Sequence, residues 1–295
     1  MFAITGITGK VGGQTARRLL DAQQPVRAIV RDLNKGAYWA ERGCEIAGAD
    51  MGDAESLARA FLGAEGVFVL LPPNFDPTPG FPEVRATISA LKYALQQAKP
   101  GRALVLSTIG AQAIETNLLT QLGIMERELE TLPMPIAFLR TAWFMENSSL
   151  DVVSARDAGT VNSFLQPLEK PVPMVATDDI GRVAAEVLQQ VWTGRRVVEL
   201  EGPQRVTPLE LGATFFKVLG RPVQVKAILR SSWEELFRSQ GMTNPEPRMQ
   251  MLDGFNQGWI EFESGEAGSR KGLIELESVL DLWSDSRASK TEVQS

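Results

Sequence analysis

Three glycines near the start of the chain have the spacing of a phosphate-binding turn. Gly6, Gly9 and Gly12 follow the strand predicted at residues 2–5 and open a segment of helical periodicity. In a strand–turn–helix of this kind, the first glycine permits the tight turn and the second lets the backbone approach a pyrophosphate. The third lets the helix pack closely on the strand. The spacing therefore predicts a dinucleotide site at the first turn of the chain.

The other residues of this turn supply further groups that can bind phosphate. Thr8, Lys10 and Val11 lie between the first glycine and the third. The N-terminus of the helix offers backbone N–H groups and positive potential, and the Lys10 ammonium adds a charge. The alternative is a flexible turn without a ligand. The position between a strand and a helix favours binding.

A basic residue ends the second predicted strand, at the distance from the glycines where nucleotide folds contact the ribose. Arg31 can pair with a 2′-phosphate and Lys35 follows it closely, which favours NADP over NAD. Asp32 keeps NAD as the less favoured alternative, because a carboxylate there would hydrogen-bond a free 2′-hydroxyl. A surface charge at a strand end is the plain alternative for Arg31.

Further candidates for the site end the third, fourth and fifth predicted strands. Asp50 could reach the adenine amino group, and it could equally cap a turn. Leu71 and Pro72 would shape the loop over the cofactor. Ser107 offers a hydroxyl that could orient a bound substrate. The equal alternative is that it is only a small residue at the end of a buried strand.

Short apolar runs alternate with amphipathic segments through the first half of the chain. Strands are expected at residues 2–5, 26–30, 44–46, 67–71, 103–107, 135–139 and 197–200. This alternation is typical of βαβ units, so we expect an α/β fold with a Rossmann-type parallel sheet and helices on both faces. Asp53, Thr207 and Ser232 are expected to begin helices, because each has the side chain of an N-cap.

The less regular second half of the chain predicts a smaller C-terminal lobe. Residues 1–150 are expected to form the NAD(P)-binding core, with residues 176–202 packing back on it. Residues 151–175 and 203–285 would then form a smaller substrate lobe. Residues 286–295 have the composition of a disordered tail.

The composition excludes several kinds of chemistry. The 295 residues contain no histidine and one cysteine, Cys44, which excludes a Ser-His-Asp triad, a histidine-ligated metal and a thiolate zinc cluster. The net charge of -6 disfavours binding to a nucleic-acid backbone. No apolar run is long enough to cross a membrane, and the chain starts on a strand rather than a signal peptide. We therefore expect a cytoplasmic protein without a metal, nucleic-acid or membrane ligand.

Five stretches of the sequence resemble the NmrA-like branch of the atypical short-chain dehydrogenase/reductase family. In chain order they are residues 5–12, 30–31, 106–111, 139–147 and 176–181. The resemblance implies an NADP-preferring fold whose C-terminal lobe closes over the nicotinamide. Members include quinone and dye reductases, enzymes that reduce phenylpropanoid-type double bonds, and regulators that bind the dinucleotide without turning it over.

The proton donor of the wider family is missing from its usual place. That family uses Tyr-x-x-x-Lys, whereas this chain has only Tyr38 and Tyr93, and neither lies on the helix after Ser107. A simple ketone is hard to reduce without such a donor. A quinone needs little acid catalysis by the protein, because its reduced form can take protons from water. The missing pair therefore disfavours ketone chemistry and leaves quinone chemistry open.

These observations predict an NAD(P)H-dependent oxidoreductase that transfers hydride to a small conjugated or aromatic acceptor, with a quinone as the leading candidate. The resemblance implies that Trp143, Phe144 and Asn147 lie where the lobe meets the nicotinamide, and packing is the alternative for the two aromatic residues. The alternative function is a non-catalytic NADPH-binding redox sensor that acts through a protein partner. A homodimer is compatible with either function.

Overall fold

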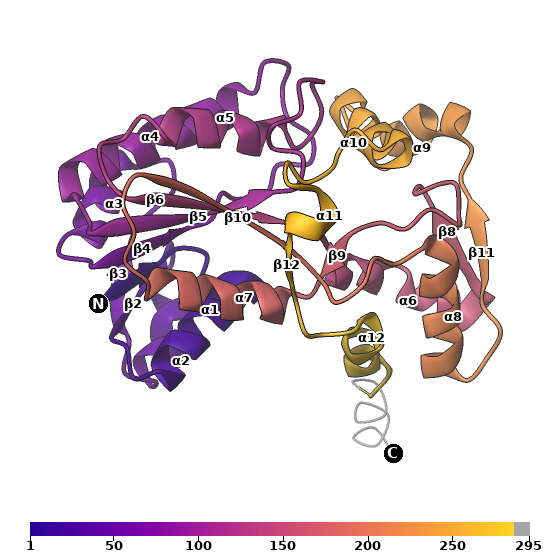
Figure 1. Cartoon of the computed structure of the whole chain (residues 1–295), viewed down its shortest axis with the longest axis horizontal. Coiled ribbons are helices and arrows are strands. Elements are labelled where there is room, and N and C mark those ends of the chain that lie inside the picture. The colour runs from indigo at the N-terminus through magenta and orange to yellow at the C-terminus, as the bar shows by residue number, and fades with distance from the viewer. Residues whose placement is uncertain (286–295) are drawn as a thin grey trace.

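An eight-stranded parallel sheet runs through the middle of the molecule, with helices on both of its faces (Figure 1). The computed structural model describes residues 1–285, and the predicted tail at 286–295 lies outside the described residues. The strands follow the order β12-β10-β6-β5-β4-β1-β2-β3, and every neighbouring pair is parallel. The α/β fold and the Rossmann-type parallel sheet predicted from the sequence are confirmed.

The elements follow the predicted alternation through the first half of the chain. The strands are β1 (Phe2–Ile4), β2 (Val26–Val30), β3 (Glu45–Gly48), β4 (Gly66–Val69), β5 (Arg102–Thr108), β6 (Ile136–Thr141), β7 (Trp143–Phe144), β8 (Thr160–Ser163), β9 (Met174–Val175), β10 (Arg195–Glu201), β11 (Gln224–Ala227) and β12 (Arg270–Lys271). The α-helices are α1 (Lys10–Asp21), α2 (Ala37–Ala40), α3 (Ala54–Phe61), α4 (Pro82–Ala98), α5 (Thr120–Leu129), α6 (Val152–Ala158), α7 (Thr177–Leu188), α8 (Pro208–Leu219), α9 (Trp233–Ser239), α10 (Glu246–Gln257), α11 (Gly265–Gly268) and α12 (Leu276–Asp285). The short 3-10 helices are η1 (Leu33–Gly36), η2 (Met145–Leu150) and η3 (Arg230–Ser232). Within residues 1–285, no helix combines the length and apolarity that crossing a bilayer requires.

Alternate residues of each inner strand face opposite layers of helices, as the two-residue period of a strand requires. In β4, Phe68 packs in the cluster that contains residues of α1 and α7. Val67 and Val69 pack in the cluster that contains residues of α3, α4 and α5. Figure 1 shows the same arrangement, with α4 and α5 on one side of the sheet and α1 and α7 on the other. Both faces of β4 are therefore buried, which explains its continuous apolar sequence.

The strand order reverses between β1 and β4, and this reversal positions the predicted site. From β1 the sheet continues through β2 and β3 on one side and through β4, β5 and β6 on the other. In α/β folds such a reversal opens a crevice at the carboxyl ends of the two central strands, and ligands bind there. The glycine turn directly follows β1, and Leu70 directly follows β4. Both segments therefore flank the crevice.

The second half of the chain returns to the sheet twice. α7 packs against α1 and β10 pairs with β6, so residues 176–202 lie against the core. β12 then pairs with the far side of β10, a return that the sequence does not indicate. The lobe beside the sheet contains α6, α8, α9, α10 and the parallel pair of β8 and β11 (Figure 1).

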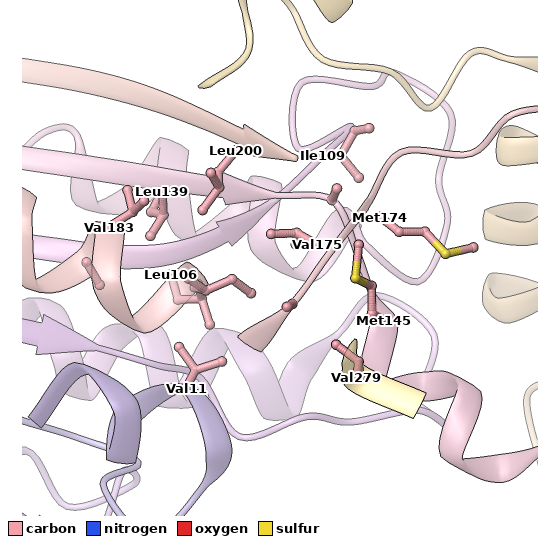
Figure 2. Close-up of a cluster of buried hydrophobic side chains, with 14 of the residues drawn as sticks. Val11, Leu106, Ile109, Leu139, Met145, Met174, Val175, Val183, Leu200 and Val279 are labelled. Carbon is pink, nitrogen blue, oxygen red and sulfur yellow. The ribbon is translucent and has the colours of Figure 1, made fainter. Parts of the chain in front are cut away.

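One hydrophobic cluster continues from the sheet into this lobe. Figure 2 shows Val11 of α1, Leu106 of β5, Met145 of η2, Val175 of β9 and Val279 of α12 within it. The short pair of β7 and β9 lies in the same region, just beyond the end of β6. Buried apolar contact therefore joins the lobe to the core.

Two of the three predicted helix caps are confirmed. The Asp53 carboxylate caps α3, and Thr207 forms a capping box with Glu210 at the start of α8. Ser232 does precede α9 as its N-cap residue, but the predicted side-chain cap is wrong, because the Ser232 hydroxyl donates to the Leu229 carbonyl instead. Ser232 is also the last residue of η3, and its hydroxyl bonds back to Leu229, the N-cap residue of that short helix.

Candidate functional site

The glycine turn between β1 and α1 has the conformation that its spacing predicts. Gly6 has a φ of +62°, in the left-handed region that favours glycine. The Gly9 N–H donates to the Gly6 carbonyl over 2.9 Å and closes the turn. A Cβ at Gly12 would overlap the Gly6 carbonyl, so glycine allows α1 to lie this close to the turn. Gly6 and Gly12 therefore shape the turn from its two ends.

Helix α1 begins beside this turn without a side-chain cap. Gly9 is its N-cap residue, and no side chain accepts a hydrogen bond there. The backbone N–H groups of Lys10 and Val11 therefore lack an intrahelical partner and, with the helix dipole, create positive potential. The Val11 side chain is buried, whereas Thr8, Gly9 and Lys10 are exposed. An anion can therefore reach the backbone of the turn from solvent.

A buried threonine fastens the two strands that flank the crevice. The Thr5 hydroxyl donates to the Phe68 carbonyl over 3.0 Å and accepts from the Leu70 N–H over 2.9 Å. These bonds link the end of β1 to the end of β4, so the glycine turn keeps a fixed position relative to the loop after β4. Thr5 is not among the predicted site residues. The available signal is its hydroxyl, which interrupts an apolar strand directly before the first glycine.

An open cavity of about 390 Å³ lies beside the glycine turn. It is lined by the turn itself, by three cationic side chains and by two aromatic ones: Ile7, Thr8, Gly9, Lys10, Gly13, Arg17, Lys35, Tyr38 and Trp39. No carboxylate is among these lining residues. A cavity with three positive charges at an uncapped helix N-terminus fits the phosphate groups of a dinucleotide.

Arg17 of α1 is held at this cavity by two neighbours. Its Nε donates to Gln14 Oε1 over 3.0 Å, and its guanidinium carbon lies 5.7 Å from the centre of the Trp39 ring. Arg17, Tyr38 and Trp39 are absent from the predicted site. For Arg17 the available signal is its position four residues after Gly13, which places both on one face of the helix that begins at the turn.

The basic residues predicted to contact the ribose take different positions. Lys35 lines the cavity, whereas Arg31 is exposed and is not one of its lining residues. Asp32 Oδ1 accepts from the Asn34 N–H over 3.0 Å and caps η1. Since the Asp32 carboxylate is engaged in this local turn, the argument that it selects NAD becomes weaker.

The predicted residues after β3 and β4 differ in how much side chain they expose. Asp50 forms the turn given above as its alternative, since Asp50 Oδ1 accepts from the Gly52 N–H over 2.8 Å. A contact of Asp50 with adenine stays a prediction. Leu71 is buried in the cluster with α3, α4 and α5, and Pro72 is exposed. The side chains of Asp50 and Pro72 are therefore open to solvent, whereas that of Leu71 is not.

The hydroxyl of Ser107 is bound inside the core. It donates to Glu126 of α5, and Glu126 forms a two-pronged ion pair with Arg140 of β6, at 3.0 and 2.7 Å. All three side chains are buried. Burial lowers the pKa of Arg140, but its bonds to Glu126 and Glu263 raise that pKa by more, so the guanidinium stays charged. An orienting role of Ser107 toward a substrate stays a prediction, because the structure gives its hydroxyl a protein partner.

Arg140 extends the same network to the neighbouring strand β10 and to the segment before α11. Its Nη1 donates to Glu263 over 2.7 Å and lies 3.6 Å from Glu199 of β10. Glu199 accepts in turn from the backbone N–H groups of Glu263 and Ser264. The network therefore ties β5, β6, β10 and α5 to the segment before α11, and Arg140 is an internal ion-pair partner.

The aromatic residues predicted to meet the nicotinamide are half-buried. Trp143 and Phe144 form β7, and Trp143 meets Phe255 of α10 edge-to-face with ring centres 5.4 Å apart. Asn147, in η2, is exposed. Packing therefore accounts for part of the surface of Trp143, and a contact of the three residues with a ligand stays a prediction.

Neither tyrosine lies on the helix that follows Ser107. Tyr38 lines the cavity at the glycine turn. Tyr93 lies on α4, where its hydroxyl donates to Glu55 over 2.6 Å. Helix α5 has the sequence TQLGIMEREL, without tyrosine or lysine, and presents Glu126 to Ser107.

Asp151, directly after η2, titrates closer to neutrality than an ordinary carboxyl group. Burial raises its pKa to about 6. The protonated form is therefore favoured in the folded protein, and its contribution to stability is fully present below about pH 4 and lost as the pH rises through about 6. The sequence does not reveal this group. The chain has no histidine, the residue type that ordinarily titrates near pH 6, and the raised pKa of Asp151 depends on its burial in the fold.

We expect Asp151→Asn to stabilise the protein at pH 8 by about 1–3 kcal/mol and to have little effect at pH 4, since the neutral amide removes the buried charge. Denaturant unfolding of both proteins at the two pH values measures this difference. A matched control is Asp53→Asn, because the pKa of the exposed Asp53 is lowered by its bonds to Ser56 and Glu55. An equal effect of Asp151→Asn at both pH values would contradict the prediction.

The curated proteins with similar sequences include two reductases. The NAD(P)H azoreductase of Xenophilus azovorans is 27% identical over 244 residues, which cover 82% of this chain and 82% of the relative. The (4-alkanoyl-5-oxo-2,5-dihydrofuran-3-yl)methyl phosphate reductase of Streptomyces griseus is 28% identical over 228 residues, or 77% of each chain.

Solved structures with the same fold include two reductases that were crystallised with a nicotinamide dinucleotide. The NADPH-dependent quinone oxidoreductase of Escherichia coli, complexed with NADPH, aligns with a TM-score of 0.80 at 22% identity, over 96% of this chain and 100% of that one. The triphenylmethane reductase of Citrobacter, complexed with NADP(H), aligns with a TM-score of 0.73 at 22% identity, over 95% of each chain.

The fold and the uncapped glycine turn define a Rossmann-type α/β protein with a site suited to a dinucleotide. The model of the NmrA-like family matches residues 1–258. The chain belongs to this family, as the five matching stretches of sequence imply.

Proposed function

We propose that this chain is an NAD(P)H-dependent reductase that binds NADPH at the glycine turn and passes hydride to a small conjugated or aromatic acceptor. The observation that carries this proposal is the uncapped N-terminus of α1 beside a cavity with three cationic side chains and no carboxylate. The relationship to an NAD(P)H azoreductase supports it, as does the shared fold with an NADPH-dependent quinone oxidoreductase.

Within this proposal, the residues after different strands would bind different parts of NADPH and the acceptor. Backbone N–H groups and one ammonium would bind the pyrophosphate from the residues of the turn: Gly6, Thr8, Gly9, Lys10, Val11 and Gly12. Three cations would share the 2′-phosphate: Arg17, Arg31 and Lys35. Asp50 would lie near the adenine, and the remaining residues would border the rest of the cofactor and the acceptor: Leu71, Pro72, Ser107, Trp143, Phe144 and Asn147.

Helix α5 offers no tyrosine or lysine as a proton donor, which favours acceptors that can be reduced without a proton from the protein. NADPH, when bound, supplies the hydride. A ketone would need a proton donor near its oxygen, but α5 has no tyrosine or lysine and Ser107 donates to Glu126. The reduced form of a quinone or an azo dye can take its protons from water. Quinones are therefore the first acceptors to test, and azo dyes the second.

The direct test is NADPH oxidation by the wild-type protein with menadione, with methyl red and with cyclohexanone as the ketone control. We expect turnover with at least one of the two conjugated acceptors and none with the ketone. NADPH binding without oxidation by either acceptor would contradict a reductase and favour the alternative, an NADPH-binding sensor that acts through a protein partner.

A second prediction concerns the choice between NADPH and NADH. We expect NADPH to bind more tightly, and Arg17→Ala or Arg31→Ala each to weaken NADPH binding by about 10- to 150-fold, the scale of one charge-assisted contact to phosphate. NADH affinity should barely change in either variant. Calorimetric titration of the wild type and both variants with each nucleotide measures the six affinities.

The matched control for these variants is Arg18→Ala, which removes a neighbouring arginine that pairs with Asp178 instead. This variant should bind NADPH like the wild type. Equal affinities of the wild type for NADPH and NADH would show that Arg31 is only a surface charge, and that Arg17 does not read the 2′-phosphate.

A further inference from the structure

The loop after β4 carries an exposed phenylalanine. Phe75 is 64% exposed and lies in the connection from β4 to α4, at the same edge of the sheet as the glycine turn. Single exposed apolar side chains are common on protein surfaces, so this exposure by itself assigns nothing. Phe75 differs from such residues in how its two neighbours are bound.

The residue before Phe75 is anchored to α5. The Asn74 carbonyl accepts from Gln121 Nε2 over 3.0 Å, and Gln121 is only 5% exposed. The same Nε2 also donates to the Leu118 carbonyl, so the amide is fixed from two sides. Asn74 Oδ1 then accepts from the Asp76 N–H over 3.1 Å and closes a tight turn around Phe75.

The residue after Phe75 is anchored to the lobe. The two carboxylate oxygens of Asp76 accept from the backbone N–H groups of Thr243, over 2.8 Å, and Asn244, over 2.6 Å. Both donors lie in the connection between α9 and α10. The two bonds hold the pKa of Asp76 below its ordinary range, so its negative charge persists as the pH falls.

The loop after β5 reaches the lobe in a similar way. The Leu118 N–H donates to the Pro247 carbonyl of α10 over 2.8 Å, and Gln112 Nε2 donates to the Glu261 carbonyl over 2.8 Å. Figure 1 shows α10 beside the loops that join the sheet to α5. The connections after β4 and β5 therefore bridge the core and the lobe, and Phe75 lies on the bridge that starts from the crevice.

We propose that Phe75 is an aromatic contact for the acceptor and that Asp76 is the residue that positions it. This inference rests on the proposed function and names a specificity residue for it. β4 lies between β1, which leads into the glycine turn, and β5, which ends near Ser107. A ring on this loop is therefore on the path from the pyrophosphate toward the nicotinamide end of the site.

The physical advantage of this arrangement is a fixed ring for a planar ligand. A conjugated acceptor gains dispersion and quadrupole energy from offset or edge-to-face contact with an aromatic ring. Since hydrogen bonds already fix the backbone on both sides of Phe75, little conformational freedom is lost when the acceptor binds. The structure therefore assigns planar conjugated molecules, rather than small aliphatic carbonyl compounds, to this part of the site.

The test compares Phe75→Ala, Phe75→Tyr and a control, Phe216→Ala, which removes a ring that is 51% exposed on α8. Calorimetry measures the Kd of menadione for the NADP⁺-loaded protein, and kinetics give KM and kcat. We expect Phe75→Ala to raise the Kd and KM for menadione about tenfold, with NADPH affinity unchanged. Phe75→Tyr should stay within about twofold of the wild type, because it keeps the ring. Phe216→Ala should change neither value.

Asp76→Asn tests the positioning role, because one oxygen that accepts an N–H is replaced by an NH₂ group. It should raise the KM for menadione more than it lowers kcat, and it should have no further effect in the Phe75→Ala background. Unchanged menadione binding in Phe75→Ala would overturn the inference. If the wild type binds menadione without turning it over, the proposed reductase function is wrong, but the comparison of Kd values still tests Phe75. If the wild type binds neither menadione nor methyl red, the inference itself is overturned.

Discussion

Arg140→Met is expected to lower the free energy of unfolding by about 3–5 kcal/mol, the usual cost of leaving a buried charge without its partner. The Glu126 side chain is only 5% exposed and takes two hydrogen bonds from Arg140. Without the Arg140 guanidinium, Glu126 would keep only the Ser107 hydroxyl as a hydrogen-bond donor and a long ion pair with Arg195, at 3.9 Å, among the contacts that the structure describes. A loss of this size is a large part of the 5–15 kcal/mol that typically stabilises a folded domain.

Denaturant unfolding of the wild type and the variant measures this loss. The matched control is Arg156→Met, since Arg156 and Asp157 form an ion pair with 36% and 57% of their side chains exposed. That variant should change stability by less than about 0.5 kcal/mol. Adding Glu126→Leu to Arg140→Met should restore part of the stability, because it removes the unpaired charge. A loss below about 1 kcal/mol for Arg140→Met would mean that water reaches Glu126 and replaces its partner.

Gly9→Val is expected to weaken NADPH binding by at least about a hundredfold, the scale of losing one or more charge-assisted bonds to phosphate, while the protein stays folded. The backbone at Gly9 has φ -91° and ψ 176°, a conformation open to any residue. A Cβ there would lie 3.3 Å from the Gly6 carbonyl and near no other atom of a different residue beyond its chain neighbours. The turn would therefore need to shift by only a few tenths of an ångström, while the branched side chain would block the approach of a phosphate to the backbone.

Fluorescence titration with NADPH and thermal unfolding separate these two effects. Gly12→Ala is the informative comparison, because its Cβ would overlap the Gly6 carbonyl and should lower stability as well as binding. Wild-type affinity in Gly9→Val would refute the assignment of the glycine turn as the phosphate site. Loss of the fold in that variant would instead mean that the turn cannot bear a side chain.

Local patterns were sufficient to predict much of the fold. The continuous apolar run that includes Val67, Phe68 and Val69 predicts a strand buried on both faces, and the two faces of β4 do lie in separate hydrophobic clusters. The spacing of Gly6 and Gly12 predicts a tight turn and close helix packing. Both features need a residue without a Cβ, and both involve only segments that are close in the chain. These features need no knowledge of distant segments.

Contacts between segments that are far apart in the chain could not be predicted from the sequence. The N-terminus of α7 is capped by Glu146, which accepts from the N–H and the hydroxyl of Thr177, 31 residues along the chain. Glu146 lies in η2, so the packing of η2 against the start of α7, and not the local sequence around Thr177, decides this partner.

The sequence by itself determined the parallel α/β sheet, the glycine turn, the family and the exclusion of histidine chemistry and of a thiolate zinc cluster. Only the tertiary structure decided that Arg17 lines the cavity, that Ser107 is bound to Glu126, and that Asp151 has a pKa of about 6. The physical reason is the range of the interactions. Strand period and turn conformation depend on neighbouring residues, whereas charge pairing and desolvation depend on side chains brought together from far apart, as with Arg140 and Glu263, 123 residues apart.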